Sequence, residues 1–130
     1  MRLLIDTHAL IWFCEGNPLL GEAARAAMED DTHERFVSHA VPWEMAIKLA
    51  LGKLNLQVDY DTIFPGVLDA NGFQMLPASL EDYRRLITLP KHHGDPFDRL
   101  MICQAQVAGL TIISNDSQLS AYGVPLLWHG

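Results

Sequence analysis

Short apolar runs alternate along this chain with longer stretches that mix apolar and polar residues. The runs at residues 3–5 and 111–113 are the clearest, since each is compact and ends close to an aspartate. Runs without polar alternation are typical of strands that are buried on both faces. We therefore expect strands at these two places and, on weaker patterns, at residues 35–38, 73–76 and 124–127.

The stretches between these runs have the spacing and the end signals of helices. Helices are predicted over residues 9–15, 21–30, 42–51, 60–70, 80–89 and 96–108, and the last four end at Gly52, Asn71-Gly72, Pro90 and Gly109. Alternating strands and helices favour an α/β fold, a parallel sheet with helices on both faces. Because the chain has 130 residues, 49% of them hydrophobic, and no internal repeat, we expect one domain spanning residues 1–130.

The composition argues against several classes of protein. Cys14 and Cys103 stand far apart without a CxxC motif, so neither a disulfide framework nor a zinc site is indicated, and a reducing, cytoplasmic location is expected. No apolar run approaches the roughly 18 residues of a membrane span, so no membrane anchor is expected. The 16 acidic and 9 basic residues give a net charge of -7, which argues against broad electrostatic capture of nucleic acid and suits a basic protein partner.

The strongest candidate chemistry comes from acidic residues near the ends of predicted strands. Asp6 follows the first strand directly, and Asp116 follows the strand at residues 111–113. Glu44 lies near the start of the helix after the second strand, and Asp98 lies near the start of the helix that leads into residues 111–113. A helix that precedes a parallel strand begins at the carboxyl end of that strand. All of these carboxylates are therefore expected at one edge of the sheet, where such folds bind ligands.

Each acid also has a structural explanation. Asp6 and Asp116 are placed to cap the segments that follow them, Glu44 is favourable near a helix start, and Asp95 fits the cap of the helix that begins at Pro96. However, carboxylates that crowd at one edge repel one another unless cations compensate their charge. Oxygen ligands of this kind suit one or two Mg²⁺ or Mn²⁺ ions, which promote the hydrolysis of phosphate esters.

Four blocks of the sequence combine these features. They are residues 4–12 (LIDTHALIW), 43–48 (WEMAIK) with 51–54 (LGKL), 92–102 (HHGDPFDRLMI) and 110–116 (LTIISND). Together, and over nearly the whole chain, they resemble the PIN-domain family and in particular the VapC-type toxins of type II toxin–antitoxin systems. The family pattern commonly has Ser or Thr where this chain has Val41-Pro42, and a basic residue where it has Gly94.

The resemblance implies a three-layer α/β/α fold with a five-stranded parallel sheet in the order 3-2-1-4-5. It implies an endoribonuclease that hydrolyses RNA phosphodiester bonds with Mg²⁺ or Mn²⁺. The residues that match the family's catalytic and metal-binding acids are Asp6, Glu44, Asp98 and Asp116. The resemblance also implies a cognate antitoxin protein as partner and a homodimer.

Several side chains near these acids are candidates for positioning RNA. The residues predicted to hold the substrate are Lys48, Lys91, His92, Arg99 and Ser114, with His93 as a helper in the same loop. Lys48 also has the i,i+4 spacing of a helical ion pair with Glu44. Nearby aromatic residues either stack on RNA bases or belong to the core or to an antitoxin groove, namely Trp12, Phe13 and Trp43.

Two other functions stay open. The first is a catalytically weak PIN-like domain that binds RNA or a protein partner through the same surface. The second is a different Mg²⁺ protein, either an aspartyl-phosphate phosphatase or a phospho-receiver domain. The sequence disfavours the phosphatase and the receiver domain. His8 stands where such a phosphatase needs a second aspartate, and the paired acids and strand-end lysine of a receiver are missing.

Overall fold

The computed structural model describes residues 1–128, so the last two residues of the predicted 1–130 domain lie outside the described part. A central sheet contains β1 (Arg2–Ile5), β2 (Glu34–Ser38), β3 (Gln74–Leu76), β4 (Thr111–Ile113) and β5 (Leu126–Leu127). All these strands pair in parallel, in the order β3-β2-β1-β4-β5. The predicted α/β fold and its strand order are therefore confirmed.

The central strand β1 pairs with a neighbour on each side. Leu4 lies opposite Phe36 of β2 and Ile112 of β4. The side chains of Leu4 and Ile112 are fully buried, because helices cover both faces of the sheet. This burial explains the unbroken apolar runs in the sequence. It also makes Asp6 the first polar residue after β1, at the carboxyl edge of the sheet.

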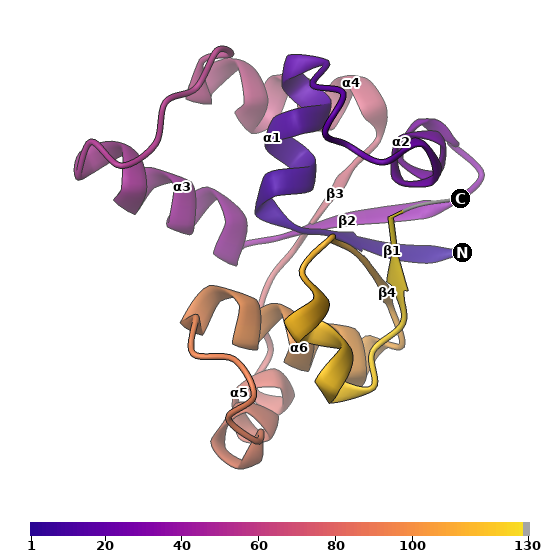
Figure 1. Cartoon of the computed structure of the whole chain (residues 1–130), viewed down its shortest axis with the longest axis vertical. Helices are drawn as coiled ribbons and strands as arrows, with labels where there is room; N and C mark the ends of the chain where they lie inside the picture. Colours follow the sequence, from indigo (N-terminus) through magenta and orange to yellow (C-terminus); the bar gives the residue numbers. More distant parts are fainter. Residues whose placement is uncertain (129–130) are drawn as a thin grey trace.

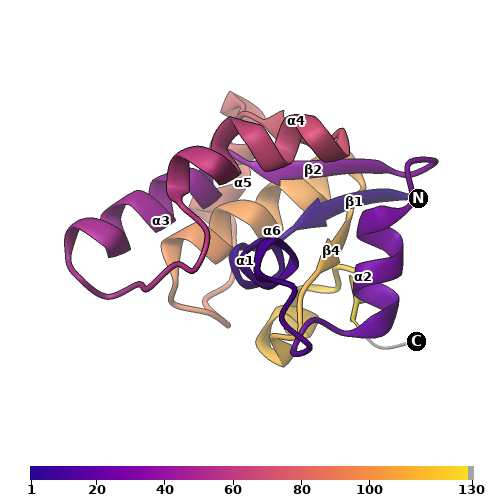
Figure 2. The ribbon, with the colours of Figure 1, turned by 90° about the horizontal axis from the view of Figure 1, so that it is seen from above.

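Helices lie on both faces of the sheet, and Figure 1 shows the three layers. On one face lie α1 (Thr7–Glu15), α2 (Glu22–Glu29) and α4 (Leu68–Asn71), and on the other lie α5 (Leu80–Thr88) and α6 (Pro96–Ala108). α3 (Ala40–Ala50) contacts both α1 and α6, and Figure 2 shows that it extends away from the sheet. Two short helical segments, η1 (Thr62–Val67) and η2 (Ser117–Tyr122), connect the larger elements.

The largest difference from the predicted elements is at residues 60–70, where a single helix was expected. The backbone leaves the helical region at Phe64 (φ -116°, ψ 105°), directly before Pro65. A residue before proline is disfavoured in the helical conformation, and proline has no N–H to continue the helix. The prediction of one helix here was therefore wrong.

The last strand is also shorter than the predicted residues 124–127, because β5 contains only Leu126–Leu127. Pro125 has no N–H to donate to the sheet, which restricts it to the edge, although its carbonyl accepts a hydrogen bond from the Ile112 N–H at 2.9 Å. The other predicted strands and helices agree with the structure to within two residues at each end. Within residues 1–128, none of the helices combines the length and the apolar character that a membrane span needs.

Candidate active site

A small cavity at the carboxyl edge of the sheet is lined by all four predicted acids. Its volume is about 110 Å³, and its lining consists of Asp6, Thr7, His8, Glu44, Lys48, Asp95, Asp98, Asn115 and Asp116. These residues come from the segments that follow β1 and β4 and from α1, α3 and α6. Since α6 runs back along the sheet before β4, its first residues reach the same edge as the end of β1. The fold thus brings distant acids together, whereas their catalytic role stays a prediction.

Asp6 both caps a helix and lines the cavity. Its Oδ1 accepts a hydrogen bond from the Ala9 N–H at 2.8 Å, which is the capping role that the sequence also indicated. The residue is only 8% exposed. Burial raises the pKa of the Asp6 carboxyl, while hydrogen bonding to the Ser114 side chain and to the Ala9 N–H opposes this rise. The charged form of Asp6 is therefore only partly stabilised by its own surroundings.

Glu44 is buried, and both of its carboxylate oxygens have partners within the chain. The Thr7 hydroxyl donates to Oε1 at 2.6 Å, and the Lys48 ammonium donates to Oε2 at 2.6 Å. This contact with Glu44 raises the pKa of Lys48. The i,i+4 spacing of Glu44 and Lys48 thus forms an ion pair inside the cavity, and Lys48 supplies a positive charge among the acids.

Helix α6 begins with two aspartates that have different contacts. Asp95 is the N-cap, and its Oδ1 accepts hydrogen bonds from the N–H groups of Phe97 at 2.8 Å and Asp98 at 3.0 Å. The Asp98 carboxylate lines the cavity, and its Oδ2 lies 3.2 Å from Nε2 of His93. Burial, followed by the nearby charge of Asp95, raises the pKa of Asp98 to about 7. Near neutral pH, the raised pKa therefore favours the protonated form of Asp98 more than in an ordinary aspartate, unless a cation stabilises the charge.

Asp116 enters the cavity from the loop after β4. Its Oδ1 accepts a hydrogen bond from the Gln118 N–H at 3.0 Å, which caps η2, and its own N–H donates to the Ser114 hydroxyl oxygen at 3.0 Å. Its Oδ2 lies 2.9 Å from Nε2 of His93. The cap fixes the carboxylate so that Oδ2 stays directed toward the other acids.

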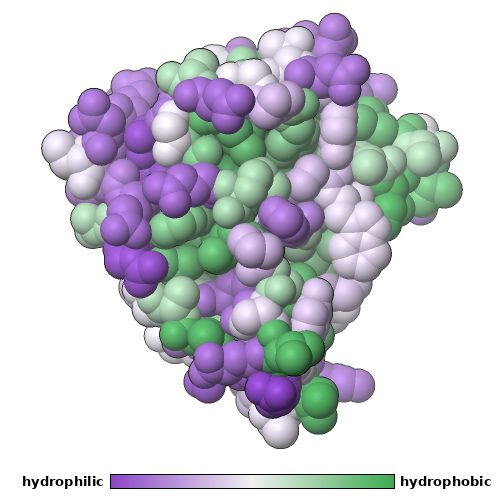
Figure 3. All heavy atoms as spheres, turned by 180° about the vertical axis from the view of Figure 1, so that it is seen from behind, coloured by the Kyte–Doolittle hydropathy of each residue, from purple (hydrophilic) through white to green (hydrophobic). Residues whose placement is uncertain are grey.

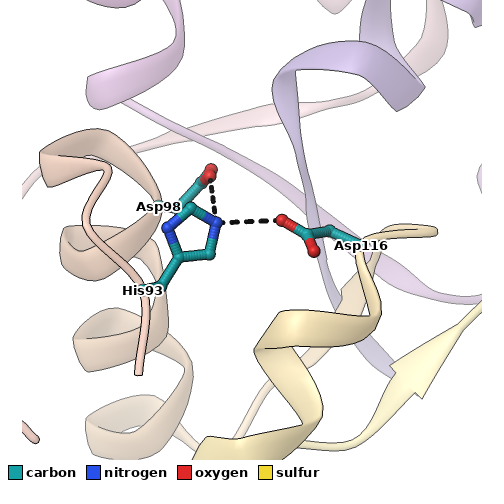
Figure 4. A group of neighbouring side chains, drawn as sticks. All are labelled: His93, Asp98 and Asp116. Atoms are coloured by element: carbon teal, nitrogen blue, oxygen red, sulfur yellow. Dashed lines mark hydrogen bonds and ion pairs between the residues drawn. The ribbon is translucent and has the colours of Figure 1, made fainter. Parts of the chain in front are cut away.

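His93 lies between Asp98 and Asp116, and Figure 4 shows one ring nitrogen directed at both carboxylates. The contacting atoms of these three residues all lie within 4.8 Å of one another. Within residues 1–128, no other group of three histidine, cysteine or acidic side chains places its ligand atoms this close. The sequence indicated His92 as one of five substrate-positioning residues and His93 as a helper in the same loop. The one sequence signal for His93 was its place two residues before the cap Asp95.

Three other predicted positioning residues, in the loop before α6 and in the first turn of α6, lie beside the acidic cavity. Lys91, His92 and Arg99 line a second cavity of about 230 Å³ together with His93 and Gly94. The Arg99 guanidinium donates to the carbonyls of Pro90 at 2.9 Å, Leu89 at 3.1 Å and His93 at 3.3 Å. Arg99 therefore holds the loop in place, while Lys91 and His92 remain at its surface.

Ser114 and two of the predicted aromatic residues are largely internal. Ser114 is 2% exposed and contacts the acids from beneath the cavity. Trp12 and Phe13 are partly buried against the core, whereas Trp43 is 61% exposed. Of the three aromatic residues, Trp43 alone exposes most of its side chain to solvent.

Comparison with known families gives one match over most of the chain. The sequence model of the family described as the PIN domain matches residues 3–125. A search of curated proteins gave no match.

Several solved structures have a similar fold. VapBC2 from Rickettsia felis bound to a DNA fragment from their promoter matches with a TM-score of 0.73 and 12% identity, covering 98% of this chain and 99% of that chain. VapBC-1 from nontypeable Haemophilus influenzae matches with a TM-score of 0.63 and 19% identity over 98% and 97% of the two chains. FitAcB from Neisseria gonorrhoeae matches with a TM-score of 0.61 and 18% identity over 96% of each. Identities this low establish a likeness of fold.

The raised pKa of Asp98 predicts that Asp98→Asn stabilises the protein at pH 8 in the presence of a chelator. The pKa of Asp98 is about 7 in the folded protein, against an ordinary value of 3.8 for an aspartate. Between these values the native state binds a proton that the unfolded state does not, so stability is lost as pH rises through that range. An asparagine stays neutral, and the variant should gain roughly 1–3 kcal/mol in the free energy of unfolding at pH 8 but little at pH 4. Urea unfolding followed by circular dichroism measures both values.

Asp31→Asn is the matched control, because Asp31 is an exposed aspartate in the turn before β2. It should change the free energy of unfolding far less than Asp98→Asn does at pH 8. An Asp98→Asn effect that is independent of pH would contradict the assignment of the raised pKa to Asp98.

Proposed function

This chain belongs to the PIN-domain family, and on that premise we propose that it is a metal-dependent endoribonuclease and the toxin of a type II toxin–antitoxin pair. PIN domains are generally nucleases. The observation that carries the proposal is that Asp6, Glu44, Asp98 and Asp116 line a single cavity. We also propose that residues 1–130 form a single PIN domain that acts in the cytoplasm.

The donor set of the cavity suits a hard divalent ion. Carboxylate oxygens line it and no cysteine does, which favours Mg²⁺ or Mn²⁺ over Zn²⁺. The pKa values of Asp6 and Asp98 are raised by burial, so the chain itself does not fully stabilise their charges. A cation between these groups would supply that stabilisation. We propose one or two ions, held by Asp6, Glu44, Asp98 and Asp116.

Bound ions would supply an activated water and stabilise the leaving oxygen in phosphodiester hydrolysis. The side chains of this chain would orient the phosphate. The Lys48 ammonium, held by Glu44 inside the cavity, would lie close to the negative charge that develops on the phosphoryl group. Lys91 and His92, at the adjacent cavity, would contact neighbouring backbone phosphates. Arg99 and Ser114 would act indirectly, by holding the loop and the acids.

The structural neighbours support a protein partner. They are VapBC and FitAcB structures, and we propose that this chain likewise binds a cognate antitoxin. The net charge of -7 favours a basic segment in that antitoxin. RNA as the substrate rests on the resemblance to VapC-type toxins.

An exposed apolar stripe on α5 supports a homodimer. Leu80, Tyr83 and Ile87 follow an i, i+3, i+7 pattern and are 69%, 47% and 82% exposed. Figure 3 shows hydrophobic side chains at the lower end of the molecule, where α5 lies in Figure 1. Such a stripe on a surface helix is usually covered by protein, and we propose that a second copy of the chain covers it.

A catalytically weak binding domain is the second candidate, and one observation favours it. Glu44 is paired with Lys48, and Asp98 and Asp116 both contact His93, so three of the acids have partners within the chain. A protein that binds Mn²⁺ but leaves single-stranded and structured RNA intact, with antitoxin absent, would support this alternative.

We expect Asp6→Asn and Asp98→Asn to lower the rate of RNA cleavage by about 100-fold or more, because each replaces a charged ligand by a neutral amide. Cleavage of a mixed pool of RNA with Mg²⁺ or Mn²⁺, followed by gel electrophoresis, measures the rates. Far-UV circular dichroism verifies that each variant is folded. Asp31→Asn serves as the control and should cleave at the wild-type rate. Full activity in either active-site variant would refute the proposed catalytic role of the acids.

The dimer proposal predicts that Ile87→Glu yields a monomer, because the new charge would be buried in the apolar interface. Light scattering coupled to size-exclusion chromatography measures the mass of both proteins. Leu19→Glu is the control, since Leu19 is 62% exposed on the loop before α2 and should leave the dimer intact. A monomeric wild-type protein, or a dimeric Ile87→Glu variant, would refute this interface.

A further inference from the structure

The hydrogen bonds of His93 determine which of its ring nitrogens carries the proton. The Asp95 backbone N–H donates to Nδ1 at 3.0 Å. Because an amide N–H is only a donor, Nδ1 must be the unprotonated nitrogen, and the proton of the ring is on Nε2. Nε2–H therefore donates to Oδ2 of Asp116 at 2.9 Å and approaches Oδ2 of Asp98 at 3.2 Å.

The Nε2–H of His93 contacts two of the carboxylates that are proposed to hold the ion. Asp98 and Asp116 would hold the ion through carboxylate oxygens, and the ring N–H contacts one oxygen of each, at 3.2 Å and 2.9 Å. A protonated nitrogen has no lone pair for a metal. Ligation through Nε2 would require the proton on Nδ1, opposite the Asp95 N–H, and the cap contacts of Asp95 hold that amide in place. The ring N–H and an ion would therefore compete for the same carboxylates.

We propose that His93 competes with the divalent ion: its ring N–H bridges Asp98 and Asp116, and an ion binds both carboxylates only after the ring turns away. The inference rests on the proposed function, since it assigns these carboxylates to the metal. Ion binding then exchanges hydrogen bonds to His93 for metal ligation. His93 thereby sets the ion concentration at which the site fills.

The surroundings of His93 allow the ring to move while its backbone stays. The backbone N–H groups of His92 and His93 donate to the Tyr122 hydroxyl at 2.9 Å and 2.8 Å. Arg99 donates to the His93 carbonyl at 3.3 Å. The imidazole also lines the second cavity, of about 230 Å³, which offers space for the turned ring. Rotation of the side chain is therefore sufficient to release the carboxylates.

Calorimetric titration of Mn²⁺ into the wild type, His93→Ala and His92→Ala tests the competition. We expect a Kd about tenfold lower for His93→Ala, because the ion no longer displaces hydrogen bonds to charged groups. His92→Ala is the matched control, since the His92 ring packs against Tyr122 and makes no ion pair with the acids among the described residues. Its Kd should stay within about twofold of the wild type.

An unchanged or higher Kd in His93→Ala would overturn the competition. If the wild type binds Mn²⁺ and cleaves RNA while His93→Ala gains no affinity, the role of His93 fails and the nuclease proposal stands. Cleavage that persists in Asp6→Asn or Asp98→Asn defeats the proposed function instead. If neither the wild type nor His93→Ala binds Mn²⁺, both proposals fail.

Nuclear magnetic resonance on the wild type tests the same point without a variant that has to fold. Long-range proton–nitrogen spectra in a chelator should identify Nε2–H as the tautomer of His93. Saturation with Mg²⁺ should shift the His93 ring signals and leave those of His92 in place. An Nδ1–H tautomer, or His93 ring signals that do not shift when Mg²⁺ is added, would refute the proposal.

Discussion

Negative side chains crowd at the carboxyl edge of the sheet, and each needs a positive or N–H partner. Water cannot fully solvate these carboxylates, because Asp6 and Glu44 are buried. The chain meets this need with different groups: the Ala9 N–H for Asp6, Lys48 for Glu44, and the His93 ring for Asp98 and Asp116. Burial and crowding together are what make the edge attractive to a cation.

The topology of the sheet produces this crowding. The order β3-β2-β1-β4-β5 places β1 beside β4, so the residues that follow these two strands, Asp6 and Asp116, leave the sheet at the same edge. Helix α6 runs back across one face before β4 and starts at that edge with Asp98. The apolar strands are covered on both sides, which excludes polar side chains from the sheet itself and leaves its rim as the place for them.

The sequence predicted the parts of this arrangement that follow from local patterns. Apolar runs and end signals gave most elements to within two residues, and strand–helix alternation placed the acids on one edge. The i,i+4 spacing indicated the pair of Glu44 and Lys48. The break at Phe64 was not predicted because the spacing of residues 60–70 fits a helix, although Pro65 disfavours the helical backbone at Phe64. The contacts of His93 were not predictable, since they depend on how the ring lies between the Asp95 N–H, Asp98 and Asp116.

The loop between α5 and α6 has its main chain tied at several points to distant residues. Arg99 binds three of its carbonyl oxygens, and the Tyr122 hydroxyl accepts two of its amide hydrogens. All of these bonds use backbone groups of the loop, so they do not depend on which side chains the loop carries. Natural or engineered variation here is therefore constrained in length more than in composition. Exchanges at Lys91 keep these main-chain bonds, whereas a residue inserted or deleted between Pro90 and His92 would shift the amides that Tyr122 binds relative to the carbonyls of Leu89 and Pro90 that Arg99 binds.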